Sequence, residues 1–212
     1  MLRGLISDGK DRVRTMKLRI IPMLAVVILA ISSTSANAVT TYVFPVAGCT
    51  VNYAHAHHDY AATDILAKAG CKFVAPINGV VDEVNRVDLW KGKTNLGIDR
   101  GGLYVSIIGA DGVRYYGSHL RSIPSNIQPG LEVVAGQLLG LVGSTGSARG
   151  TASHLHFGIS WPTPANTWWV RRGEVLPWKY LDAWKKGKDF SPVKEVNARK
   201  LKVGEIPPVP KK

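Results

Sequence analysis

Histidines that could bind a metal ion gather in two places along this chain of 212 residues. His154 and His156 are separated by one residue, and side chains at that spacing on an extended strand point to the same face. Upstream, the run His55–His58 contains three histidines and is followed by Asp64. A catalytic zinc needs three nitrogen or oxygen ligands and one open position for water. The two clusters together therefore predict a zinc site.

The order of these residues resembles that of the lysostaphin-type zinc peptidases of the M23 family, which cut peptide cross-links in bacterial cell walls. That family has an early His and Asp, a middle His and a late His-x-His. The resemblance runs from about Tyr42 to Trp161 and includes the flanking runs 73–81 and 134–140. It implies a zinc endopeptidase whose substrate is the peptide stems of peptidoglycan.

The resemblance also implies a role for each residue of the pattern. His58, Asp64 and His156 are expected to bind the zinc, and His154 is expected to act as the general base. His119, the middle histidine, would stabilise the oxyanion or assist proton transfer.

The first ligand departs from the commonest family pattern, because five residues separate His58 from Asp64, whereas that pattern has three. One branch of the family has a His-His pair and a Pro before the Asp, and this chain has Ala61 in place of that Pro. The second His of that pair corresponds to His58, which we favour over His57, with His55 third. In extended chain, His57 and His58 would point to opposite faces and could not both bind one ion.

The first 38 residues have the features of a secretory signal peptide. Lys17 and Arg19 precede the apolar run 20–31, and small residues follow up to a cleavage site after Ala38. The apolar run is short for a bilayer span, so export is favoured over an uncleaved membrane anchor. Met16 is an alternative start.

Cys49 and Cys71 are the only cysteines. Disulfides persist outside the cytoplasm, so we expect these two cysteines to form one in an exported chain.

The positive charge lies mostly at the two ends of the chain. The net charge is +12, of which residues 1–38 carry +4 and residues 185–212 carry +6. The region between them, assigned as a peptidase domain at 39–184, is close to neutral, which argues against a nucleic-acid-binding module. The basic, Pro-containing tail at 185–212 is expected to be disordered, or to be attracted to anionic cell-wall polymers.

The fold is expected to be all-β, an antiparallel twisted sheet or sandwich with a substrate groove. Two runs, 102–109 and 113–119, flank an Asp-Gly turn and predict a hairpin, and further short strands follow at 138–142 and 154–160. A short helix is expected at 180–186. The tryptophans that follow the late motif are expected to cover one end of the core.

Two functions remain open from the sequence. The first is a secreted, monomeric zinc endopeptidase, and the second is a non-catalytic protein of the same architecture that binds the wall or regulates a hydrolase. The absence of a Gly-x-Ser-x-Gly motif argues against a serine hydrolase. A candidate for every ligand and auxiliary histidine is present, which favours the enzyme.

Overall fold

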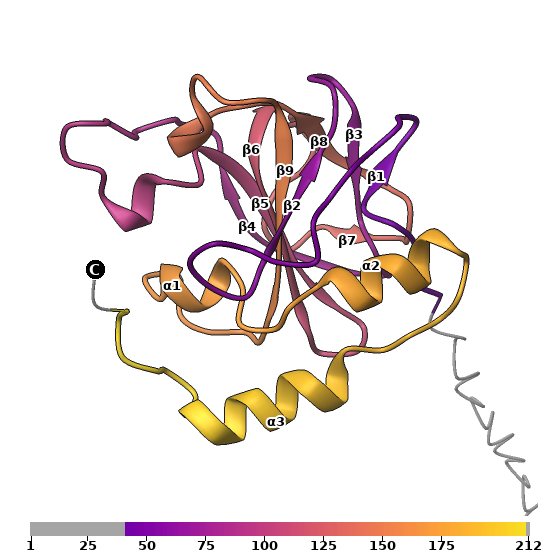
Figure 1. The fold of residues 1–212 in the computed structure, drawn as a ribbon. Helices are drawn as coiled ribbons and strands as arrows, with labels where there is room; N and C mark the ends of the chain where they lie inside the picture. The colour runs from indigo at the N-terminus through magenta and orange to yellow at the C-terminus, as the bar shows by residue number, and fades with distance from the viewer. Residues whose placement is uncertain (1–40, 211–212) are drawn as a thin grey trace, which may run out of the picture. The chain divides into compact units, whose positions relative to one another are not determined.

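Nine strands and three α-helices make up residues 41–210, the part described by the computed structural model (Figure 1). The predicted signal peptide at 1–38 lies outside this part. The strands are β1 (Val46–Ala47), β2 (Thr63–Leu66), β3 (Lys72–Val74), β4 (Gly79–Asn85), β5 (Leu103–Gly109), β6 (Arg114–Ser122), β7 (Glu132–Val133), β8 (Leu138–Val142) and β9 (His154–Ser160). The helices are α1 (Trp168–Arg171), α2 (Trp178–Lys185) and α3 (Val193–Val203), with 3₁₀ turns η1 (Gly97–Asp99) and η2 (Gly146–Ala148).

All strand pairs are antiparallel, and β6 is the strand at which the sheet divides. The order β1-β3-β8-β6-β5-β4-β7 forms one path, while β9 and then β2 branch from β6. Residues Arg114–Ser118 of β6 pair with β9, and residues Leu120–Ser122 pair with β8. The all-β, antiparallel prediction is confirmed, as is the hairpin formed by β5 and β6.

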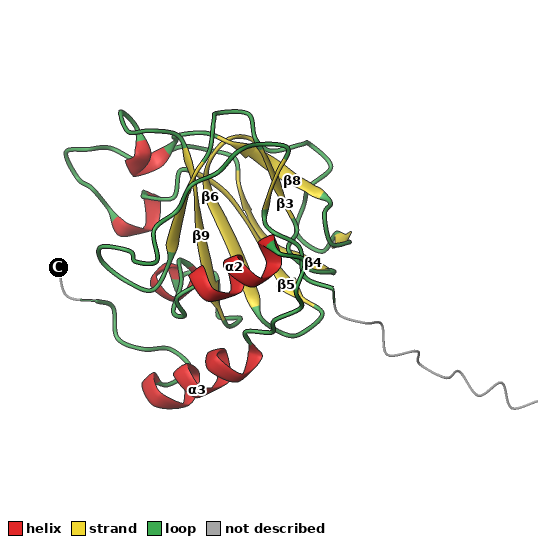
Figure 2. Ribbon diagram, turned by 45° about the vertical axis from the view of Figure 1, so that its right-hand side comes forward, coloured by secondary structure: helices red, strands yellow, loops and turns green. Residues whose placement is uncertain are grey.

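Successive side chains along β9 point alternately into the hydrophobic core and to the opposite face of the sheet. Leu155, Phe157 and Ile159 are fully buried in the hydrophobic core, so His154 and His156 project from the other side. Helix α2 covers the core face, where the Trp184 ring packs against Tyr115 and Phe157 (Figure 2). This helix confirms the short helix predicted near the C-terminus.

Residues 185–210 are ordered in the structure, in contrast to the disorder predicted for this tail. Val196 of α3 is buried in the core. The segment after α3 accepts hydrogen bonds on its backbone from two indoles: Trp161 Nε1 donates to the Glu205 carbonyl and Trp169 Nε1 donates to the Pro207 carbonyl, each at 2.8 Å. The sequence-based prediction failed because it weighed charge and proline content, whereas these contacts join residues far apart in the chain.

Cys49 and Cys71 form the predicted disulfide, across a sequence separation of 22 residues. The bond closes the segment that carries the upstream histidines. Among residues 41–210, no helix has the length and apolar character needed to cross a membrane.

Loss of the disulfide should lower the free energy of unfolding by about 3 kcal/mol, because a closed loop of this length restricts the unfolded chain. The test is urea unfolding of Cys49→Ala against wild type in oxidising buffer. Cys49 is exposed, so under reducing conditions the two proteins should unfold together. Equal stability in oxidising buffer would contradict the expectation.

Two substitutions in α3 test whether the tail is part of the fold. Val196 is 2% exposed and Leu201 is 87% exposed on the same helix. Val196→Ala should cost about 2 kcal/mol, because it removes buried methyl groups and leaves a cavity, whereas Leu201→Ala should cost less than about 0.5 kcal/mol. Calorimetry of both variants measures the difference, and identical unfolding curves would show that α3 does not pack on the domain.

Candidate metal and catalytic site

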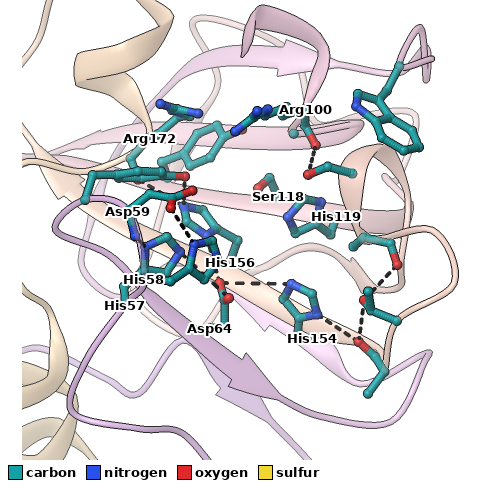
Figure 3. Close-up of a pocket in the computed structure, with 18 of the residues that line it drawn as sticks. His57, His58, Asp59, Asp64, Arg100, Ser118, His119, His154, His156 and Arg172 are labelled. Atoms are coloured by element: carbon teal, nitrogen blue, oxygen red, sulfur yellow. Dashed lines mark hydrogen bonds and ion pairs between the residues drawn. The ribbon is translucent and has the colours of Figure 1, made fainter. Parts of the chain in front are cut away.

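A cavity of about 540 Å³ opens on the face of the sheet opposite the core, and the predicted site residues line it (Figure 3). They come from three separate parts of the chain, namely the loop before β2 together with β2 itself, strand β6, and strand β9. The five residues are His58, Asp64, His119, His154 and His156.

The pairing of β2 with β9 brings Asp64 next to His154 and His156. Asp64 lies directly opposite His156, and Leu66 lies opposite His154. Cross-strand partners present their side chains on the same face of the sheet. As a result, His156 Nδ1 is 2.8 Å from Asp64 Oδ1, and His154 Nε2 is 4.0 Å from the same oxygen.

The structure distinguishes the two adjacent upstream histidines. His57 is 4% exposed at its side chain, and its Nε2 lies 3.8 Å from Asp64 Oδ2. Its ring is 5.2 Å from that of His156. His58 is 72% exposed, and its Nδ1 faces Asp59 Oδ1 at 2.9 Å. His57, His58 and Asp64 each place a ligand atom within 4.8 Å of the others, but His57 is the histidine that points toward both Asp64 and His156.

Hydrogen bonding around His156 favours a cation next to Asp64. Its Nε2 lies 3.2 Å from the carbonyl oxygen of Arg172 and 3.1 Å from the Tyr60 hydroxyl, so a proton on Nε2 can be donated to either oxygen. Nδ1 then faces a carboxylate oxygen of Asp64. A metal ion bound to both atoms would satisfy this contact. The Arg172 carbonyl can approach because Gly158 has no side chain, since a Cβ there would lie 2.0 Å from the carbonyl oxygen.

His154 and His119 are held in matching orientations. His154 Nδ1 donates to the Ala152 carbonyl and His119 Nδ1 donates to the Thr145 carbonyl, each at 2.8 Å. In the neutral rings, Nε2 is therefore an unprotonated acceptor. The two ring centroids are 4.9 Å apart.

His119 has an unusual backbone conformation that brings it to the site. Its φ is +63°, a left-handed value that non-glycine residues adopt rarely. It lies where β6 exchanges its partner β9 for β8, and the register with β5 also shifts there. Regular alternation would put Ser118 and His119 on opposite faces, yet both line the cavity. The irregularity turns the His119 ring toward His154 and His156.

Burial sets the charge states at the site. It lowers the pKa of His119 to about 3 and that of His57 to about 4, and repulsion from His156 adds to both shifts. For Asp64, burial raises the pKa, but the hydrogen bond and charge of His156 outweigh it, so its pKa lies below the ordinary value. Near neutral pH the two rings are neutral and Asp64 is charged, which are the states in which these groups bind metals.

The lining of the cavity also includes Tyr60, Arg100 and Arg172, none of which was identified as a site residue from the sequence. The Tyr60 hydroxyl lies 3.1 Å from His156 Nε2. The one available signal for Arg172 was its place among the tryptophans after the late motif, which were expected to cover one end of the core. Arg100 has no sequence signal.

Several solved structures resemble the chain. A LytM protein from Ruminococcus gnavus ATCC 29149, whose structure carries the name glycyl-glycine endopeptidase, has a TM-score of 0.53 at 22% identity, over 70% of this chain and 62% of that one. This likeness shows a shared fold. Lysostaphin from Staphylococcus simulans gives a TM-score of 0.49 at 26% identity, over 68% and 54% of the two chains. Its catalytic domain gives 0.46 at 24%, over 64% and 92%.

The comparison with curated proteins yields no match. The pattern of peptidase family M23 matches residues 56–167, more than half of the chain. This span contains all the histidines and both aspartates that line the cavity. The chain therefore belongs to peptidase family M23.

Proposed function

We propose that this protein is an exported zinc-dependent endopeptidase that hydrolyses peptide cross-links of bacterial peptidoglycan. One observation carries the proposal: three potential metal ligands and two further histidines meet in one cavity of an M23-family chain. A non-catalytic protein of this architecture would have no need for both auxiliary histidines at the ligand cluster.

We assign the metal to His57, Asp64 and His156, and this choice replaces His58 with its better-placed neighbour. Imidazole and carboxylate ligands suit zinc, and three of them leave a position open. When bound, zinc polarises the scissile carbonyl and makes water a usable nucleophile near neutral pH.

His154 and His119 supply the proton chemistry. His154 Nε2 faces the site as an acceptor and takes a proton during attack. The neutral His119 also presents an acceptor at Nε2, so proton transfer or orientation of water fits this ring better than donation to an oxyanion.

Export is supported by the signal-peptide-like segment at 1–38 and by the disulfide. The lysines of α3 include Lys194 and Lys202, which are exposed and could attract anionic wall polymers. We propose that the enzyme acts as a monomer.

Purified peptidoglycan should release peptide fragments when treated with the protein, and mass spectrometry of these fragments identifies the bond that is cut. A chelator should abolish release and added zinc should restore it. His154→Ala should keep stoichiometric zinc but lose about 10²- to 10⁴-fold in rate, because only the proton acceptor is removed. Full activity in metal-free protein would overturn the mechanism.

Zinc content of single alanine variants tests the ligand assignment. His57→Ala should weaken zinc binding at least about 100-fold, because loss of a ligand costs more than loss of a residue that only hydrogen-bonds to a ligand. His58→Ala should retain the metal. His55→Ala is the matched control, because His55 pairs with Asp182 at 3.1 Å and stacks on Trp178. Retention of zinc in His57→Ala with loss in His58→Ala would reverse the assignment.

A further inference from the structure

Two arginines line the same cavity as the candidate metal ligands, Arg100 after η1 and Arg172 after α1. In Figure 3 both lie along the side of the cavity away from Asp64 and His154. They are close enough for their charges to repel, an effect second to burial in lowering the pKa of Arg172. Holding two like charges together costs free energy, which an anionic ligand would offset.

The Arg172 guanidinium is stacked between two aromatic rings, and its N–H groups have no hydrogen-bond partner within residues 41–210. Its central carbon lies 4.2 Å from the Tyr60 ring centroid and 4.6 Å from that of Trp168. No hydrogen bond or ion pair of this guanidinium occurs within residues 41–210, and its Nε is buried without a partner. Such an unsatisfied donor is costly, and stacking leaves its N–H groups free to bind a ligand in the guanidinium plane.

The loop of η1 supports this arrangement from behind. Gly97 packs against the Trp168 ring so closely that a Cβ there would lie 2.1 Å from it. Arg100, at the end of the same loop, donates from Nε to Asn95 Oδ1 at 3.0 Å, which fixes the side chain and leaves its terminal nitrogens free. Both arginines are thus positioned before any ligand arrives.

The acids in the cavity are already engaged elsewhere. Asp59 pairs with His58 and Asp64 pairs with His156, and neither lies within ion-pair distance of Arg100 or Arg172. Asp59 attracts both arginines from a longer distance, but among residues 41–210 no carboxylate forms an ion pair with either of them.

We propose that Arg172, with Arg100, binds a carboxylate of the substrate peptide next to the bond that is cut. The proposal rests on the function proposed above and names the substrate class of that site. Guanidinium groups match the planar, two-oxygen geometry of a carboxylate. Peptide stems of the wall carry free carboxylates, and conversion of one to a carboxamide removes the charge while keeping the shape.

The test uses the stem tetrapeptide L-Ala-γ-D-Glu-L-Lys-D-Ala and two analogues in which one carboxylate, that of D-Glu or that of the terminal D-Ala, is a carboxamide. Calorimetric titration of the full protein measures each Kd, and mass spectrometry checks that the peptides stay intact. One of the two conversions should weaken binding to wild type at least about tenfold, since bonds between charged groups are strong.

Variants assign the effect to the arginines. In Arg172→Gln, and also in Arg100→Gln, which leaves the Arg172 stacking intact, the carboxylate and carboxamide forms should bind within about twofold of each other. Arg121→Gln is the matched control, because Arg121 is exposed on β6 and lies outside the cavity, and it should keep the wild-type preference.

Equal binding of all three peptides to wild type, no binding at millimolar concentration, or a preference that persists in both arginine variants would overturn the proposal. Digestion of peptidoglycan by the same preparation separates the two claims. Digestion without a carboxylate preference refutes the subsite alone, whereas an arginine-dependent preference without digestion refutes the endopeptidase.

Discussion

The pairing of the four-residue strand β2 with β9 is the constraint on which the site depends. It places Asp64 opposite His156, and its register decides which side chains face the cavity. A slip of one residue would turn Asp64 to the opposite face and expose Ile65, which is fully buried. The hydrophobic core therefore fixes the register of the site as well as the fold. The Cys49–Cys71 disulfide constrains the loop that enters β2 and carries His57.

Strand β6 pairs with β9 and adds His119 to the site formed by β2 and β9. Because β6 changes partners from β9 to β8, the sheet divides and opens a cavity beside the division. His119 lies at that point and accepts a left-handed backbone, an energetic cost of about 1–3 kcal/mol. The surrounding ladder hydrogen bonds and the bond to the Thr145 carbonyl hold it there.

Arg172 contributes to the site through both its backbone and its side chain. Its carbonyl fixes His156 through Nε2, while its side chain forms part of the cavity wall. The same residue thus orients a candidate metal ligand and, in our proposal, the peptide. Gly158 makes this possible because the absence of a side chain lets the two backbones approach. The segment that follows α3 is held against α1 by the hydrogen bond from the Trp169 indole to the Pro207 carbonyl.

The sequence by itself determined strands β5, β6, β8 and β9, the shared face of His154 and His156, and the family pattern, because alternation and motif spacing are local properties. It favoured His58, whereas the structure turns His57 toward Asp64 and His156, since a loop histidine is oriented by what it packs against rather than by its neighbours in the chain. It also missed the order of the tail and the place of Arg172 and Arg100. Those features depend on burial of Val196, on the indole hydrogen bonds and on stacking between distant aromatic rings. Only the tertiary structure brings such residues together, because long-range contacts leave no periodic signal in a single sequence.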